Sequence, residues 1–495
     1  MMEANPGLQR IAHLSLPQRR HLLGELLRRR LERPERFPLS FAQERVWLFE
    51  RLHPGSAVYN IPLLLPLPGE LDMTALERSY RDILNRHAVL RTVMTDLDGV
   101  PMQEVRLAPP THLELLDLSE LPQAEQDQHL RAALAHDARQ PFDLTQGPLI
   151  RARVIRLDPR PGWLAVNMHH LVSDGWSLGI FARELHTLYH AHAQGRVPPL
   201  PELDLQFFDF VAWQREWLSG AGLRQLEEYW RARLAGAPRV LDLPTDHPRP
   251  PEQSFDGALF DSVLPKALAG ALVRRAQAEQ VTLFVLLLSA YAVLLYRYTG
   301  QDDMVIGVPM AGRVRTEFEP LIGFFVNNLA LRIDLGGNPA FCDLLQRVHE
   351  AVLQAHEHQA YPFDKLVDLL GVKRDPSRAP IHQVVFNLQN NPTWGPMELD
   401  AEPSAPPLDA HSRTAKWDLN LALLGGAEGM AVSMEYCTAL FDRSSIAAMI
   451  ARFAHILEAV AADSSLRLLD IPLGPTSAPG RADGAAGEDA DTFSF

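Results

Sequence analysis

Two adjacent histidines, His169 and His170, are followed by Asp174 and Gly175, and this spacing is the feature of the 495-residue chain best suited to chemistry. Histidine has an unperturbed pKa near neutrality, so an imidazole facing a cavity accepts a proton from an attacking amine or hydroxyl. A carboxylate a few residues on can hold the loop by pairing with an arginine. The alternative is a buried pair of histidines satisfied by backbone groups, because polar groups in such positions are often structural.

A buried strand is predicted to end at these histidines. Residues 162–166 are apolar and partly alternating, which is typical of such a strand. Because side chains alternate across a strand, one face carries Leu164, Val166, Met168 and His170, and the other carries Ala165, Asn167 and His169. We therefore expect one imidazole to meet a substrate while the other packs behind it. Asp174 and Gly175 then break the strand, and residues 176–193 form a helix.

Hydrophobic periodicity predicts irregularly alternating helices and strands along the rest of the chain. Helices are expected at 41–52, 71–86, 123–137, 207–218, 223–234, 267–279, 282–298, 339–360 and 444–462. Strands are expected at 90–94, 103–107, 149–157, 259–264, 304–309, 329–333, 384–389, 417–424 and 431–436. No glycine loop that would cradle a phosphate is present, which favours an α/β sandwich over a nucleotide-binding sheet.

The histidine stretch resembles the HHxxxDG signature of the condensation-domain superfamily of nonribosomal peptide synthetases. Six further stretches resemble the family's other motifs, in the family's order: residues 40–47, 86–92, 207–213, 322–328, 358–364 and 374–378. Departures from those motifs are Ala88 for Glu, Phe207 for Tyr, Val211 for Ala, Asn328 for Thr and Ala360 for an acid. The resemblance covers about residues 37–475.

This resemblance implies the fold class: two α/β sandwich lobes like chloramphenicol acetyltransferase, in a V-shaped arrangement with the active site in a tunnel between them. We expect an N-terminal basic helix or linker at 1–36 and an N-terminal lobe with the histidine motif at 37–200. A C-terminal lobe with the inter-lobe helices is expected at 201–475, followed by a disordered acidic tail at 476–495.

The resemblance also implies catalytic roles. His170 takes the family's catalytic position, either deprotonating the attacking amine or mainly orienting it. The Gly175 backbone N–H is expected to stabilise the tetrahedral oxyanion. His169 and Asp174 are expected to support the site, with Asp174 paired with Arg86.

Three further residues are candidates for lining the substrate tunnel: Ser173, Trp176 and Asn327. Asn327 follows a glycine, two phenylalanines and a valine, which suggests close backbone approach and a buried polar turn. Its amide either binds substrate or caps that turn.

The implied reaction joins an acyl or peptidyl thioester on a donor carrier protein to an amine, or less often a hydroxyl, on an acceptor carrier. The product is an amide or an ester. Each carrier brings its substrate on a phosphopantetheine arm, and we expect no cofactor bound by this chain itself. The chain has no carrier attachment motif and no adenylation motif. Its two cysteines, Cys342 and Cys437, lie outside any CxxC or Cys/His array, so no metal site is expected.

Two other interpretations remain. A stand-alone acyltransferase of the same superfamily would use coenzyme A thioesters or a free acceptor. A non-catalytic recruiting module would have lost the histidine motif, which is intact here.

Composition narrows the partners and the location. The net charge of −14 argues against nucleic acid, whose binding requires clustered positive charge. The longest apolar run, residues 281–296, falls short of the ~20 residues needed to span a bilayer, so no membrane association is expected. With no secretory signal visible, the expected location is the cytoplasm.

Both ends of the chain could contact other synthetase subunits. Residues 1–36 carry eight arginines against four glutamates, and this helix either packs on its own domain or docks a preceding acidic carrier. The tail ends with Phe493 and Phe495 beside acids, and it either stays solvated or forms a short docking motif.

Overall fold

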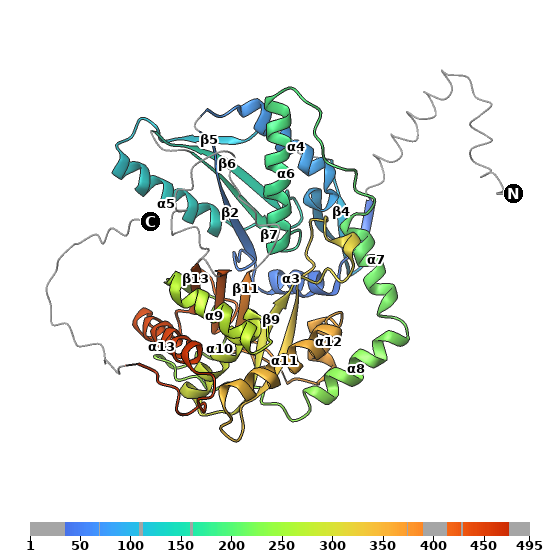
Figure 1. Cartoon of the computed structure of the whole chain (residues 1–495). Helices are drawn as coiled ribbons and strands as arrows, with labels where there is room; N and C mark the ends of the chain where they lie inside the picture. The colour runs from blue at the N-terminus through green and yellow to red at the C-terminus, as the bar shows by residue number, and fades with distance from the viewer. Residues whose placement is uncertain are drawn as a thin grey trace, which may run out of the picture.

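The computed structural model describes residues 35–68, 70–107, 112–158, 162–373, 375–389, 413–426 and 429–474. The expected basic N-terminal helix and acidic tail lie outside the described residues. Within these ranges the chain forms two α/β lobes, drawn one above the other in Figure 1. Most of the predicted elements are confirmed within a few residues of their expected ends. Among the strands and α-helices of the described residues, four were not predicted: Glu35–Pro38, Asn60–Pro66, Glu114–Asp117 and Phe363–Leu369.

The first lobe contains two sheets, with strand orders β2-β7-β6-β5 and β1-β4-β3. Its strands are β1 (Glu35–Pro38), β2 (Asn60–Pro66), β3 (Thr92–Leu97), β4 (Val100–Val105), β5 (Glu114–Asp117), β6 (Ile150–Arg156) and β7 (Trp163–His169). Its helices are α3 (Phe41–Leu52), α4 (Met73–Arg86), α5 (Gln123–Arg139) and α6 (Gly175–Ala193).

The second half of the chain builds one sheet with the order β10-β9-β11-β12-β13-β8. Its strands are β8 (Gly257–Leu264), β9 (Asp303–Met310), β10 (Asn327–Asp334), β11 (Val384–Gln389), β12 (Leu419–Gly426) and β13 (Gly429–Cys437). Its helices are α7 (Phe207–Trp217), α8 (Ala221–Arg233), α9 (Lys266–Ala278), α10 (Leu283–Thr299), α11 (Phe341–Glu357), α12 (Phe363–Leu369) and α13 (Arg443–Ala462).

Strand β7 lies between β2 and β6 in its sheet and ends at His169, so His170 is the first residue after the strand. It pairs antiparallel with both β2 and β6, and all its residues are buried. The predicted alternation is confirmed, because Val166 and Met168 belong to the main core of the first lobe while Ala165 belongs to a smaller cluster with residues of α5. β2 lacked a strand signature because it contains Pro62 and Pro66; prolines are tolerated there because β2 is an edge strand.

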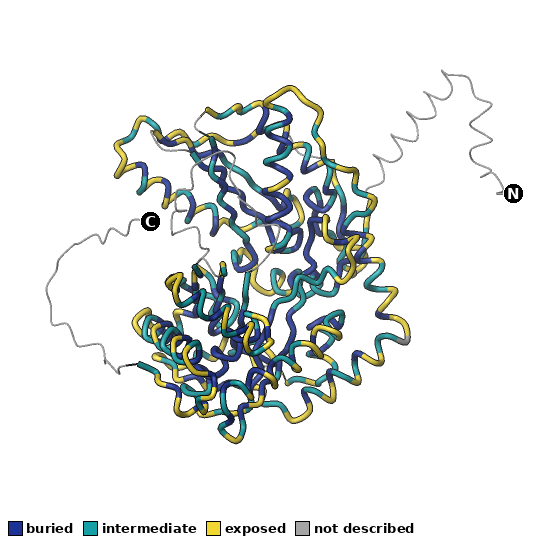
Figure 2. Tube along the Cα trace, in the orientation of Figure 1, coloured by how far each residue is buried: buried dark blue, intermediate teal, exposed yellow. Residues whose placement is uncertain are grey.

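Segments of the second half pack into the first lobe's core. Phe207 and Phe210 of α7, together with Phe318, Phe324 and Phe325, belong to the same buried cluster as β7. Gly323 makes this packing possible, because a Cβ there would lie 2.2 Å from the Phe207 ring. The close backbone approach predicted for this motif is therefore confirmed. Core side chains of the first lobe therefore come from both sides of the boundary expected near residue 200. Figure 2 shows the buried interior of each lobe.

Apolar helices fill the second lobe's core. Helix α10, predicted as a buried helix, is capped by Thr282 and ends at Gly300 in the left-handed conformation. Within the described part of the chain, α13 is long and apolar enough to cross a membrane, and α9 with α10 passes the same test as a pair bent by 105°. Residues such as Phe453 and Leu457 of α13 are fully buried in the core, which accounts for its apolar character.

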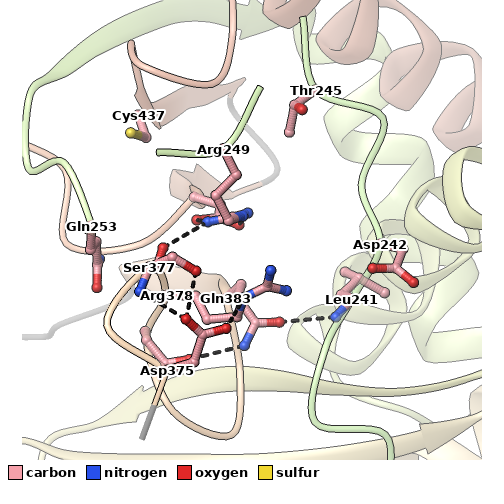
Figure 3. A network of polar contacts seen from close by, with 12 residues as sticks. Leu241, Asp242, Thr245, Arg249, Gln253, Asp375, Ser377, Arg378, Gln383 and Cys437 are labelled. Atoms are coloured by element: carbon pink, nitrogen blue, oxygen red, sulfur yellow. Dashed lines mark hydrogen bonds and ion pairs between the residues drawn. The ribbon is translucent and has the colours of Figure 1, made fainter. Parts of the chain in front are cut away.

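The segment connecting α8 to β8 is fastened to the second lobe by a polar network (Figure 3). Arg249 Nη1 donates to the Ser377 carbonyl oxygen over 3.2 Å and to Asp418 Oδ1 over 3.1 Å. Gln383 Oε1 accepts from the Leu241 N–H at 2.9 Å. The last family-like motif, which contains Ser377, therefore has structural contacts here.

His382 generates a prediction about acid stability. Its ring is 1% exposed, and neither ring nitrogen has a hydrogen-bond partner in the described part of the chain. Burial lowers the pKa of His382 to about 3. Between pH 6.5 and about 3 the folded state therefore binds fewer protons than the unfolded state, so stability falls with falling pH. We expect His382→Phe to remove about 2 kcal/mol of the stability lost between pH 7.5 and 5, measured by urea unfolding.

The matched control is His129→Phe, at an exposed position of α5. That variant should keep the parent's pH dependence. An unchanged pH dependence in His382→Phe would contradict the prediction.

Candidate functional site

The two histidines hold their protons on different ring nitrogens. His169 is 1% exposed; its Nδ1 accepts from the Leu171 N–H at 3.2 Å, and its Nε2 lies 3.4 Å from Glu50 Oε1. A carboxylate only accepts, so the proton is assigned to Nε2. Both nitrogens of His169 are thus engaged by protein groups, which supports its expected structural role.

His170 has the opposite tautomer. Its Nδ1 lies 3.1 Å from the Ser173 carbonyl oxygen, which only accepts, so Nδ1 carries the proton and Nε2 keeps a lone pair. Its ring is half-buried between Tyr59 and Phe324, with ring centroids at 6.1 and 5.2 Å. The backbone N–H of His170 donates to the Tyr59 carbonyl oxygen at 2.8 Å. This arrangement fixes the ring while leaving an acceptor nitrogen.

Burial holds the pKa of His170 well below its usual range, and the positive charge of Lys416 lowers it further. The bond to the Ser173 carbonyl acts in the opposite direction but does not offset these effects. His170 is therefore a neutral imidazole at neutral pH, able to accept a hydrogen bond.

A groove open to solvent shares one residue with the surroundings of His170. Phe324 packs on the His170 ring and also forms part of the groove wall. Trp213 and Trp217 of α7, stacked at 5.8 Å, line the same groove. The groove thus lies between α7, the segment before β10 and the start of α3, with aromatic surface along its length.

The expected ion pair between Asp174 and Arg86 is wrong. Asp174 instead makes a bidentate pair with Arg313, at 3.0 and 3.2 Å, and neither side chain is more than 1% exposed. Asp174 also accepts from the N–H groups of Ser177, at 2.8 Å, and Phe325, at 3.0 Å. Asp174 is thus the N-cap of α6 and the anchor for the segment between β9 and β10. Arg86 does not pair with Asp174, because the packing of α4 on α6 places Arg86 beside Glu184.

Arg86 and His87 both contact Glu184. Arg86 Nε donates to Oε1 at 3.0 Å, and His87 Nε2 lies 2.8 Å from Oε2. Desolvation opposes the ionised form of Glu184, yet its pKa is lowered by the combined contacts with His87 and Arg86. The second family-like motif therefore joins α4 to α6, and Ala88 contributes its N–H to Gln206 at 2.9 Å.

The remaining predicted residues lie near the site in different roles. Ser173 is buried and its Oγ has no hydrogen-bond partner among the residues described. Trp176 donates from Nε1 to the Glu319 carbonyl at 3.0 Å. Asn327 lines the groove, but its amide bonds Gln359 and Tyr361 carbonyls and the Phe363 N–H, so it braces that turn. Gly175, the first residue of α6, is exposed, and a Cβ there would meet nothing within 4 Å.

Four residues of the site were not assigned roles from sequence: Gln43, Tyr59, Arg313 and Lys416. Gln43 is fully buried and donates to the Leu171 carbonyl at 2.8 Å, which fixes the backbone after the histidines. A glutamine in an amphipathic helix that also carries an N-terminal serine signals a capping box, and Ser40 and Gln43 form one. Arg313 follows Gly312, whose Cβ would lie 1.9 Å from the Phe325 carbonyl oxygen, but sequence spacing does not show that its partner is 139 residues away.

The Asp174–Arg313 pair generates a prediction about stability. Asp174→Asn keeps an N-cap acceptor but leaves a buried guanidinium without a counter-charge. We expect a loss of about 3–5 kcal/mol in unfolding free energy. The double variant Asp174→Asn with Arg313→Met should lose less unfolding free energy than the sum of the losses in the two single variants. Urea unfolding of the four proteins measures this coupling.

The control is the exposed pair Arg315–Glu317, at 2.9 Å. Neutralising both residues should leave the unfolding free energy almost unchanged, because water and salt screen an exposed pair. Strict additivity at Asp174 and Arg313 would contradict the prediction.

Comparison with known proteins identifies the family. The protein-family model described as the condensation domain matches residues 34–477 of this chain. One of the linear gramicidin synthase subunits of Brevibacillus parabrevis is 43% identical over 475 residues, 95% of this chain but 9% of the relative. Phosphinothricin tripeptide synthetase PhsB of Streptomyces viridochromogenes is 39% identical, over 92% of this chain and 38% of the relative. The chain thus spans less than two fifths of either synthetase.

A solved structure agrees with these relatives. The X-domain from teicoplanin biosynthesis is 30% identical, with a TM-score of 0.78, covering 89% of this chain and 98% of the other. The same domain has been solved in complex with OxyB, with a TM-score of 0.76. The chloramphenicol-acetyltransferase-like fold implied by the motifs is confirmed by these likenesses. Condensation domains of nonribosomal peptide synthetases form amide bonds by acyl transfer, and this chain belongs to the condensation-domain family.

Proposed function

We propose that this chain joins a donor acyl or peptidyl thioester to a carrier-bound amine, with His170 contacting the attacking nitrogen. The observation that carries the proposal is the state of this one ring: neutral, half-buried, with its proton on Nδ1 and a lone pair on Nε2. The groove beside Phe324 is also lined by Trp213 and Trp217, and these aromatic side chains would offer apolar contacts to a pantetheine arm. A hydroxyl acceptor would yield an ester by the same route.

The chemical step is a nucleophilic displacement at the thioester carbonyl. The amine nitrogen forms a C–N bond, the carbonyl oxygen becomes an oxyanion, and collapse of this intermediate breaks the C–S bond. The departing thiolate takes up the proton that the amine loses, so one amide and one thiol result. An α-ammonium has a pKa near ~8, so a neutral amine is accessible without a strong base. His170 Nε2 accepts an N–H of that amine and orients its lone pair, which supplies rate through proximity.

We propose that the start of α6 stabilises the oxyanion. Gly175 leaves open space beside the backbone, so an acyl group can approach closely. The positive end of the helix dipole favours negative charge at this point. Asp174 fixes the position of the start of α6, because it caps this helix and also pairs with Arg313.

Donor and acceptor carriers on other polypeptides, or on a longer form of this one, are the proposed partners. The relatives are synthetase subunits several times longer than this chain, which supports partners of that kind. We propose no cofactor or metal held by this chain, with phosphopantetheine arriving on the carriers, and a cytoplasmic location. A coenzyme A thioester as donor is the principal alternative, and it would be distinguished by comparing carrier-bound and coenzyme A-bound forms of one acyl group.

A recruiting role is the second candidate, favoured by the likeness to the X-domain that was solved with OxyB. A module of that kind does not need a neutral His170 with an available lone pair. Activity of the variant described next separates the two candidates.

The central test is intact-mass spectrometry of loaded donor and acceptor carriers taken from the neighbouring synthetase genes. The parent should transfer the donor acyl group to the acceptor carrier. His170→Ala should lower the transfer rate by about 100-fold or more, in the range usual for a general acid–base group. His129→Ala, on the exposed face of α5, should transfer at the parental rate. Undiminished transfer by His170→Ala, with an unchanged melting temperature, would overturn the proposal.

Docking by the chain ends is tested separately. Deleting residues 1–34 should slow transfer from the upstream carrier while leaving transfer from a small acyl thioester unchanged. A peptide of residues 476–495 should bind the next synthetase of the assembly line in a titration. Both segments lie outside the described residues, so unchanged carrier transfer or absent peptide binding would remove the respective docking role.

A further inference from the structure

A lysine from the second lobe packs on the tyrosine that covers His170 in the first. Lys416 precedes β12, and its Nζ lies 4.7 Å from the centre of the Tyr59 ring. Tyr59 in turn packs edge-on against His170 and accepts its backbone N–H. Lys416 and His170 are 246 positions apart in sequence, so Lys416 meets the Tyr59–His170 pair only when the two lobes are assembled.

The backbone that presents Lys416 is fixed by bonds along its length. Gln253 Nε2 donates to the Lys416 carbonyl oxygen at 2.9 Å, and Asp418 N–H donates to the Gln383 carbonyl at 2.9 Å. The Asp418 carboxylate is held by Arg249, whose position is shown in Figure 3. A segment held in this way places the Lys416 side chain reproducibly rather than leaving it free to move with a surface loop.

Several charged groups surround this lysine and the histidines. Arg45 of α3 pairs with Asp364 of α12 at 3.1 Å, and Glu50 of α3 contacts His169. Glu435 of β13 acts on Lys416 from its own lobe. Burial lowers the pKa of Lys416 to about 8 despite the acids Glu435 and Glu50, so the ammonium form predominates at neutral pH. Lys416 is also the largest charge effect that lowers the pKa of His170.

We propose that Lys416 is a positioning residue that keeps both the His170 ring and the acceptor amine uncharged. A like charge raises the free energy of an imidazolium and of an ammonium placed beside it. With Lys416 in place, the acceptor is therefore bound as the free amine, the form that attacks, and Nε2 keeps its lone pair. The part concerning the amine rests on the proposed function; the part concerning His170 stands without it.

The test is a histidine titration followed by NMR, using the full chain labelled with ¹³C at histidine Cε1. The His170 signal is assigned by its absence in His170→Ala. Lys416→Met removes the charge and keeps the length of the side chain, so the titration midpoint of His170 should move to higher pH. Lys416→Arg retains the charge and should restore the parental behaviour.

Lys365→Met is the matched control, because Lys365 also covers an aromatic ring, with Nζ 4.4 Å from the centre of Phe41. It is not among the charges that act on His170, and its variant should titrate as the parent does. An unshifted His170 signal in Lys416→Met, or an equal shift in Lys416→Arg, would overturn the proposal.

A rate measurement tests the amine separately. With glycine loaded on an acceptor carrier, the ratio of the transfer rate at pH 8 to that at pH 6 should rise in Lys416→Met and stay parental in Lys416→Arg. An unchanged ratio with a shifted NMR midpoint would overturn the role toward the amine alone. If no variant, and not the parent, transfers any acyl group, the proposed function fails while the NMR result still decides the effect on His170.

Discussion

The buried pair between Asp174 and Arg313 is the constraint on which the site depends. Removing two charges from water is costly, and this cost is offset only when geometry and further hydrogen bonds are favourable. The Asp174 carboxylate accepts hydrogen bonds from both terminal guanidinium nitrogens of Arg313 and from two backbone N–H groups. Arg313 also lies 4.2 Å over the Phe325 ring. One interaction therefore sets the start of α6, the loop after His170 and the segment that carries Phe324. The wall of the groove and the His170 ring are positioned by the same charge pair.

Local patterns predicted most of the architecture because they depend on neighbours in sequence. The strand ending at His169, the helix beginning after Asp174 and the buried helix α10 each carry their own periodicity and caps. β2 escaped prediction because its prolines obscure the strand pattern and its place at a sheet edge is a property of the assembled lobe. The need of Asp174 for an arginine was also predictable. The choice between Arg86 and Arg313 was not, since it depends on how α4 and α6 align and on how a distant segment enters the first lobe.

The two histidines illustrate how adjacent identical residues acquire different chemistry. His169, the last residue of β7, contacts a carboxylate and a backbone donor, while His170, the first residue after the strand, has a carbonyl partner and a partly open face. Different surroundings for the two rings were expected, but the end of β7 at His169 was not, because strand alternation had placed both histidines within one strand. The second lobe contributes Lys416, which packs on Tyr59 of the first lobe beside His170, and this contact joins segments that share no sequence pattern.

The exchange of segments between the lobes has a consequence for recombining synthetases. Phe318, Phe324 and Phe325 are supplied by the second half of the chain yet complete the hydrophobic interior around β7. A chimera joined near residue 200 would unite a first lobe from one parent with core side chains from another, so mismatched volumes would fall beside the His170 ring. Half-domain grafting in this family therefore calls for moving residues 207–217 and 311–326 together with the first lobe, as one non-contiguous cassette.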